Sequence, residues 1–157
     1  MRLLGIDPGT GITGFGVVDV KDGKYKLVDA GVVRTKAHTP QKERLETIFE
    51  NISEIIEEHK PQIMSIEKLF FTNNITTAMT VSEARGVVLL CAQQADMQLY
   101  EYTPLQIKQA ITGYGKADKK QVQEMVRVVM KLKEVPKPDD CADAIAVAVT
   151  HAMHAGL

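Results

Sequence analysis

The stretch LLGIDPGTGITGFGVV, Leu3 to Val18, runs an apolar strand directly into the carboxylate of Asp7. Four glycines follow, and a second, glycine-rich strand is expected over residues 12–20. Asp-Pro-Gly also fits an ordinary turn, which accounts for Asp7 about as well as a functional role does. The rest of the chain must therefore decide why a buried strand ends on a carboxylate.

The spacing of apolar residues predicts a mixed sheet. Strands are expected over residues 3–7, 12–20 and 25–33, with a hairpin turn at Asp22-Gly23, and then over 62–67 and 99–102. Helices are expected to begin at Thr39-Pro40, at Asn73 or Asn74, at Thr103-Pro104, at Asp118 and at Pro138, the last two running to about Leu132 and Met153. Strands separated by helices pair in parallel. The pattern predicts one α/β domain over residues 1–157, a five-stranded sheet of order 3-2-1-4-5 with helices on both faces.

Composition is that of an ordinary globular protein. The 157 residues are 45% hydrophobic and 25% charged, with a net charge of −1. Charge is unevenly spread, because residues 108–137 carry eight basic and three acidic side chains, a net of +5 that suits a polyanion. Cys91 and Cys141 lack metal or disulfide spacing. No signal peptide and no apolar run of eighteen residues is found, so we expect a cytoplasmic protein without a membrane span.

Other carboxylates share the setting of Asp7. Glu67 ends a strand expected to lie parallel to the first, so both acids would project at one carboxyl edge of the sheet; the alternative is a solvated glutamate. Asp140 and Asp143 are three residues apart and share a helix face. Asp139, and partly Asp140, also suit a helix N-terminus. Asp143 opens an apolar helix with no basic residue after it, where a charge is costly unless paired or coordinated.

These four acids come from three distant segments, and crowding them costs several kcal/mol in repulsion. Divalent cations remove that cost. Oxygen ligands without clustered cysteine or histidine favour Mg²⁺ or Mn²⁺, and two ions about 4 Å apart suit in-line phosphoryl transfer. The sequence therefore predicts that Asp7 ends its strand to hold metal. The glycines would let backbone and a polyanion approach closely.

Five blocks, GIDPGTGITGFGVV, IEKLFFTNN, EARGVV, IKQAITGYGKADKKQVQ and DDCADAIAVAVTH, cover nearly the whole chain in order. At these blocks the sequence resembles the RuvC family of Holliday junction resolvases. The resemblance implies a ribonuclease H-like fold and a homodimer that uses Mg²⁺ to nick two opposing strands of four-way DNA, leaving 5′-phosphates, in recombination and repair. It implies cooperation with the proteins RuvA and RuvB. The catalytic, metal-binding set that it implies is Asp7, Glu67, Asp140 and Asp143.

The resemblance also assigns DNA contacts. Phe70 matches a phenylalanine that stacks on a base near the cut. The alternative is that Phe70 and Phe71 both pack in the hydrophobic core. We expect Phe71 to be buried and Phe70 to be free. Lys108 and Lys119 match lysines that contact DNA, against the alternative of a solvated helix face. Gly86 in mid-helix costs about 1 kcal/mol relative to alanine, which close approach of a second subunit would explain; packing on its own sheet is the alternative.

Three other functions compete. The first is an ATP-binding protein, because GIDPGTGITG resembles the phosphate-binding hairpin of such proteins. Those proteins need two lobes, however, and this chain supplies one. The second is another ribonuclease H-like nuclease, acting on RNA–DNA hybrids or of the YqgF type. The third is a junction-binding module without catalysis, which the four acids disfavour. His151 and His154, three apart, suit the C-terminus of a helix better than a metal site.

Overall fold

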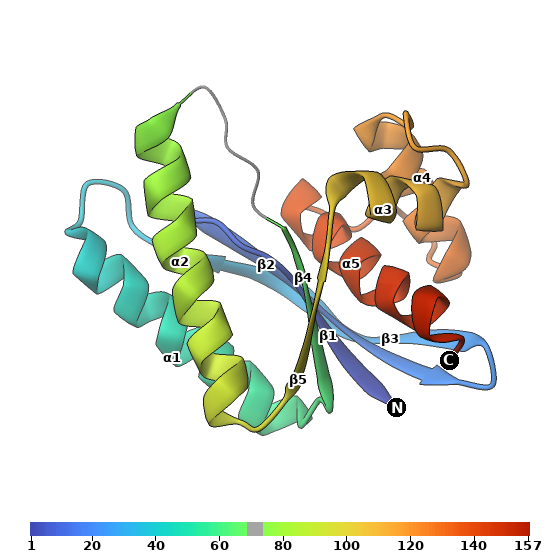
Figure 1. The fold of residues 1–157 in the computed structure, drawn as a ribbon, viewed down its shortest axis with the longest axis horizontal. Coiled ribbons are helices and arrows are strands. Elements are labelled where there is room, and N and C mark those ends of the chain that lie inside the picture. The colour runs from blue at the N-terminus through green and yellow to red at the C-terminus, as the bar shows by residue number, and fades with distance from the viewer. Residues whose placement is uncertain (69–73) are drawn as a thin grey trace.

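The computed structural model describes residues 1–68 and 74–157. Within them, five strands form one mixed sheet in the order β3-β2-β1-β4-β5 (Figure 1). The first three pair antiparallel, whereas β4 joins β1 and β5 joins β4 in parallel. The strands are β1 (Arg2–Asp7), β2 (Ile12–Lys21), β3 (Lys24–Arg34), β4 (Ile63–Glu67) and β5 (Gln98–Tyr102). The predicted strand order is confirmed.

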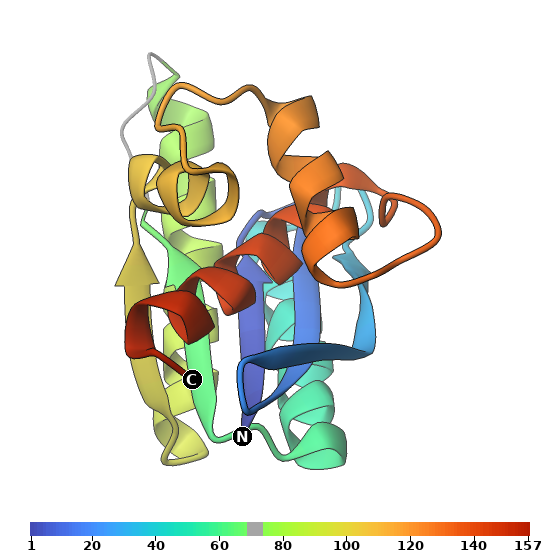
Figure 2. The same cartoon turned by 90° about the vertical axis from the view of Figure 1, so that its right-hand side faces the viewer.

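The helices cover both faces of the sheet, as predicted. They are α1 (Gln41–His59), α2 (Ile75–Gln94), α3 (Pro104–Thr112), α4 (Lys119–Val129) and α5 (Asp139–Ala155). Helices α1 and α2 lie side by side on one face. Helix α5 crosses the other face, and α3 and α4 lie over α5 (Figure 2). The carboxyl ends of β1 and β4 point toward the end of the sheet where α5 begins.

Local sequence sets most helix boundaries. Asn74, Thr103 and Asp118 each accept a hydrogen bond from the backbone N–H three residues on, so the predicted helix starts are confirmed there. Helix α4 ends at Val129, one turn earlier than predicted. Lys131 takes the left-handed conformation (φ 54°), which closes the helix and turns the chain away.

Three glycines form the seat of α5. A Cβ on Gly5 would lie 2.0 Å from the carbonyl oxygen of Ala144, and one on Gly14 would lie 2.0 Å from that of Asp140. A Cβ on Gly16 would lie 2.7 Å from the side chain of Ile145. The predicted close approach of backbone is confirmed, but the approaching backbone belongs to α5. At Gly14 and Gly16, two of the four glycines that follow Asp7, α5 fills the space that we had assigned to a polyanion.

Helix α2 has an unexpected composition. An 18-residue window of α2 has a mean hydropathy of 1.3, so by length and composition alone this helix could cross a membrane. The sequence had predicted no membrane span in any segment. One side of it belongs to the core between α1 and the sheet, through Ala84, Val88 and Cys91. Its opposite side is exposed at Ile75, Met79 and Leu90.

Candidate active site

Strand register brings Asp7 and Glu67 together. Strands β1 and β4 run parallel with Ile6 opposite Ile66, so the next residue of each strand is one of the two acids. Both side chains are half-buried at the carboxyl edge of the sheet. No described residue donates a hydrogen bond to the Asp7 carboxylate, so it does not serve as the cap of its own turn. The predicted meeting of these acids is confirmed.

The glycine seat brings the two other acids to the same edge. Gly14 on β2 lies opposite Asp7 in the sheet, and the backbone of Asp140 rests on Gly14. Asp143 lies one turn further along α5, and its side chain is 23% exposed. The charges of Asp143 and Asp140 both act on Asp7. All four predicted acids therefore share one electrostatic environment.

Burial and crowding raise the affinity of these acids for protons. Burial is the largest cause that raises the pKa of Asp7 from 3.8 to about 8, followed by repulsion from Asp143, Glu67 and Asp140. Burial, and then Asp143, also raises the pKa of Glu67. A carboxylate with a pKa near 8 and no cation beside it is poorly accommodated as an anion at neutral pH.

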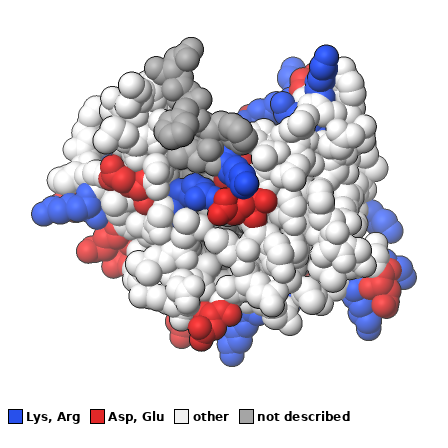
Figure 3. Space-filling model, in the orientation of Figure 1, with Lys and Arg blue, Asp and Glu red and all other residues white. Residues whose placement is uncertain are grey.

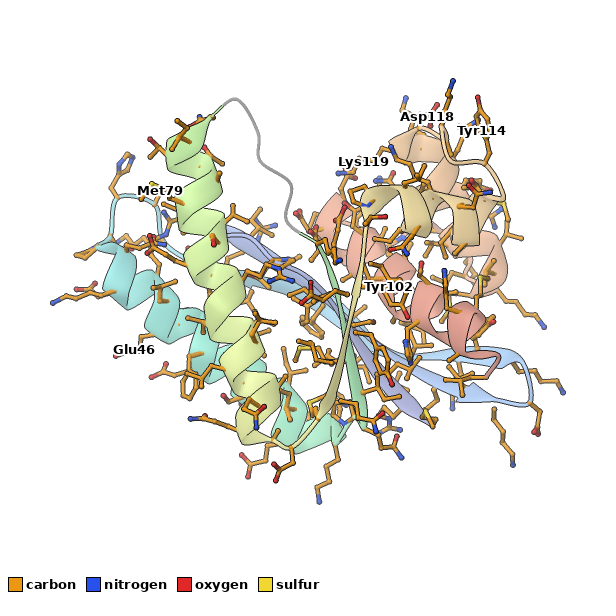
Figure 4. The ribbon with its side chains drawn as sticks, in the orientation of Figure 1. Glu46, Met79, Tyr102, Tyr114, Asp118 and Lys119 are labelled. Atoms are coloured by element: carbon orange, nitrogen blue, oxygen red, sulfur yellow. The ribbon has the colours of Figure 1, made fainter. Side chains whose placement is uncertain are left out.

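Lys119 compensates part of this charge. Its ammonium lies 3.1 Å from Asp143 and 3.7 Å from Asp139, beside the first turn of α5 (Figure 4). Burial alone lowers the pKa of Lys119, but the hydrogen bond and attraction of Asp143 outweigh it and raise that pKa. The sequence has no basic residue after Asp143 in its own helix, and its basic partner comes instead from α4. Burial still leaves the pKa of Asp143 raised.

Two cavities meet at Glu67. One of about 370 Å³ is lined by Glu67, Asp143, Lys108 and Lys119, among others, so both predicted DNA-binding lysines lie beside the acids. The other, of about 270 Å³, includes Asp7, Glu67 and Arg85 in its walls. A larger hollow of about 940 Å³ lies around Arg2 at the opposite end of the sheet, away from the acids. Asp7, Glu67 and Asp143 therefore line the two smaller cavities, and none of them lines the larger hollow.

The donor set suits a hard divalent cation. Carboxylate oxygens are the ligands that Mg²⁺ and Mn²⁺ take, and a cation would relieve the mutual repulsion of the four acids. As the side chains stand, no three Asp, Glu, His or Cys residues of the described chain are close enough to enclose one ion. Binding would therefore require the carboxylates to draw inward.

Comparison with known proteins identifies the family. The family model described as crossover junction endodeoxyribonuclease RuvC matches residues 3–151. The chain belongs to the RuvC family. A RuvC relative from Brevibacillus brevis is 55% identical over 152 residues, which span 97% of this chain and 92% of the relative. One from Heliobacterium modesticaldum is 52% identical over 149 residues, spanning 95% of this chain and 92% of the relative.

Solved structures agree with this assignment. Thermus thermophilus RuvC in complex with Holliday junction substrate superposes with a TM-score of 0.94 at 41% identity, covering 99% of this chain and 94% of that one. The yeast mitochondrial Holliday junction resolvase superposes with a TM-score of 0.70 at 13% identity, covering 97% and 79%, and supports the fold alone. The ribonuclease H-like fold predicted from the resemblance to RuvC is confirmed.

Two further sequence predictions have different outcomes. Phe70 and Phe71 lie outside the described residues, so their roles stay predictions. His151 was expected to suit the C-terminus of its helix, and it shares a 2.8 Å hydrogen bond with Tyr102. Burial, and then His154, lowers the pKa of His151, which disfavours the cation expected at a helix end, and the ring lies in the core.

Sequence reasoning missed Arg85 in this RuvC chain. It lies on α2, lines the smaller cavity with Asp7, and forms a 2.9 Å ion pair with Glu101 on β5. Its one signal in the sequence is a basic residue on the inner side of an apolar helix, where an unpaired charge would be costly.

Proposed function

We propose that this protein resolves four-way DNA junctions by paired symmetric nicks, as an endodeoxyribonuclease of homologous recombination and DNA repair. The observation that carries this proposal is the sharing of one site by Asp7, Glu67, Asp140 and Asp143, with Lys108 and Lys119 in the adjoining cavity. Membership of a family of crossover junction endodeoxyribonucleases supplies the reaction and the substrate. The T. thermophilus relative holds a Holliday junction substrate.

The four acids would hold two divalent cations, Mg²⁺ by preference, with Mn²⁺ as a substitute. Bound there, the cations would activate a water and stabilise the leaving 3′ oxygen, giving a 5′-phosphate and a 3′-hydroxyl that a ligase can seal. Asp7 and Glu67 supply ligands from the rigid end of the sheet. Lys119, 3.1 Å from Asp143, would share in balancing its negative charge.

DNA contacts follow from the same geometry. Lys108 and Lys119 line the cavity that holds Glu67 and Asp143, so their ammonium groups are placed to contact phosphates beside the cut. Phe70 follows Glu67 by three residues in sequence, and we propose that it stacks on a base next to the cleaved bond. Phe70→Ala should then reduce cleavage without unfolding the protein; loss of the fold would mark Phe70 as a core residue.

A second copy of this chain is the proposed occupant of the exposed side of α2. Ile75, Met79 and Leu90 on this side are 73%, 59% and 49% exposed. Gly86 is also exposed, and a Cβ there would meet nothing within 4 Å, so packing on its own sheet does not explain the glycine. Two cuts in a two-fold symmetric junction call for an isologous pair, and α2 against α2 provides one.

Cellular partners follow from the family. We propose cooperation with the branch-migration proteins RuvA and RuvB, and action in the cytoplasm, where bacterial DNA lies. The function is tested with labelled four-way DNA and linear duplex of the same sequence, each with and without Mg²⁺. We expect paired nicks in the four-way DNA only, and only with Mg²⁺. Equal cleavage of linear duplex, or cleavage that survives Asp7→Asn, would contradict the proposal.

A further inference from the structure

The guanidinium of Arg85 is only partly satisfied among residues 1–68 and 74–157. Its side chain is 15% exposed, and its Nη2 lies 2.9 Å from a carboxylate oxygen of Glu101. Its Nε is fully buried and has no hydrogen-bond partner there. A guanidinium presents five N–H groups, and leaving the buried Nε–H of Arg85 unmet is costly. The arrangement indicates that an anion completes the site.

The cavity beside Arg85 has the charge and size for such an anion. Its volume is about 270 Å³, and its basic walls are Arg85 from α2 and Lys68 just after β4. Its acidic walls are Asp7 and Glu67. Figure 3 shows basic and acidic atoms side by side in the middle of this face of the molecule.

Basic residues therefore stand on both sides of the acids. Lys108 and Lys119 lie in the cavity on the α5 side of Glu67, and Lys68 and Arg85 in the cavity on its α2 side. A DNA strand whose scissile phosphate rests on the acids carries further phosphates in both directions. One direction is covered by the lysines that the sequence predicted, and the other has no assigned contact.

We infer that Arg85 and Lys68 form a subsite for a backbone phosphate of the cleaved strand, next to the phosphate that is cut. Arginine suits this role because its planar fork binds two phosphate oxygens at once while Glu101 fixes its orientation. This inference rests on the proposed function and adds to it the path of the strand on the α2 side.

The competing explanation is structural. The ion pair of Arg85 with Glu101 joins α2 to the edge strand β5, and its only role could be to hold the helix. In that case removing Arg85 and removing Glu101 should have the same effect on junction binding. A phosphate subsite predicts opposite results, because losing Glu101 leaves the guanidinium free for DNA, whereas losing Arg85 removes the contact.

The salt dependence of junction binding separates these explanations. Junction binding is measured from about 50 to about 300 mM KCl, with Ca²⁺ in place of Mg²⁺ because it takes the same oxygen ligands. A gel confirms that the DNA stays intact during the measurement. Arg85→Gln should make the slope of log K against log salt shallower by about 0.7–0.9, the value of one phosphate contact. Arg85→Lys should keep most of the slope. Glu101→Gln should leave it unchanged or steeper. Arg2→Gln, which removes an ion pair with Asp19 at the far end of the sheet, is the matched control and should leave it unchanged.

Lys68→Gln tests the subsite without disturbing α2, because Lys68 is exposed and has no side-chain partner among the described residues. It should also lower the slope by about 0.7–0.9. Equal slopes for wild type, Arg85→Gln and Lys68→Gln would overturn the inference, as would equal losses in Arg85→Gln and Glu101→Gln. If wild type itself shows no preference for four-way DNA, it is the proposed function that fails. Thermal melting of each variant confirms that it folds.

Discussion

Replacing Asp7 by asparagine should stabilise the metal-free protein while abolishing its cleavage activity. Asp7 is pressed against three other acids and has a pKa raised to about 8, chiefly by burial. The amide keeps the shape of the carboxylate and removes the charge. A residue that serves catalysis at the expense of stability is expected to behave in this way.

The magnitude follows from proton linkage. The folded state holds the Asp7 proton more tightly than the unfolded chain, so this contribution to folding is complete below pH 3.8 and is lost as pH rises through about 8. At pH 7 the loss is at most about 4 kcal/mol, at about 1.36 kcal/mol per pH unit. Partial hydration and Lys119 reduce it, and we expect Asp7→Asn to gain about 1–2 kcal/mol, or about 3–8 °C in Tm.

The assay is thermal unfolding in EDTA from pH 4 to 8, followed by circular dichroism. Wild type should lose stability relative to Asp7→Asn as pH rises, and Mg²⁺ should raise the Tm of wild type more than that of the variant. Asp19→Asn is the matched control with the opposite sign, because Arg2 lowers the pKa of Asp19 and its charge therefore stabilises the fold. Equal stability of wild type and Asp7→Asn across this range would refute the proposed crowding of charge.

Three further substitutions test the packing. Gly14→Ala should cost about 3 kcal/mol in urea unfolding, because its Cβ would meet the carbonyl of Asp140 at 2.0 Å; a cost under 1 kcal/mol would contradict the seat of α5. Gly86→Ala should weaken self-association in sedimentation while stabilising the isolated helix by about 1 kcal/mol; unchanged association would exclude Gly86 from the dimer contact. Tyr102→Phe should lose about 1–2 kcal/mol through its hydrogen bond to His151 and leave kcat unchanged; equal stability would show that the bond contributes nothing.

The fold was predictable where neighbouring residues decide it. Apolar spacing, capping residues and turn chemistry are local signals, and they predicted the five strands and the helix starts at Thr103 and Asp118. The end of α4 was not predictable, because a lysine in the left-handed conformation has no strong signal in sequence. The role of Gly14 was also hidden, since a glycine shows that something approaches but does not say what.

The candidate site also contains residues that the sequence placed together and residues that it missed. Asp7 and Glu67 could be placed together because two parallel strands that end on acids put them at one edge. The partner of Asp143 was missed because the search covered its own helix, whereas Lys119 comes from a different one. Arg85 was missed for the same reason, since its ion-pair partner lies on β5. Contacts between elements depend on how the elements pack, which spacing along the chain does not encode.

The position of α5 ties the chemistry to the core. Its side chains from Ala144 to Ala152 are almost wholly buried, and this burial offsets the cost of bringing acids to the same edge as Asp7. The small residues of α5 and the glycines beneath it serve one purpose, because a larger side chain on either surface would lift the helix and carry Asp140 and Asp143 away from Asp7. The glycine-rich second strand is therefore part of the proposed metal site although it supplies no ligand, and activity should be as sensitive to Gly14 as to the acids themselves.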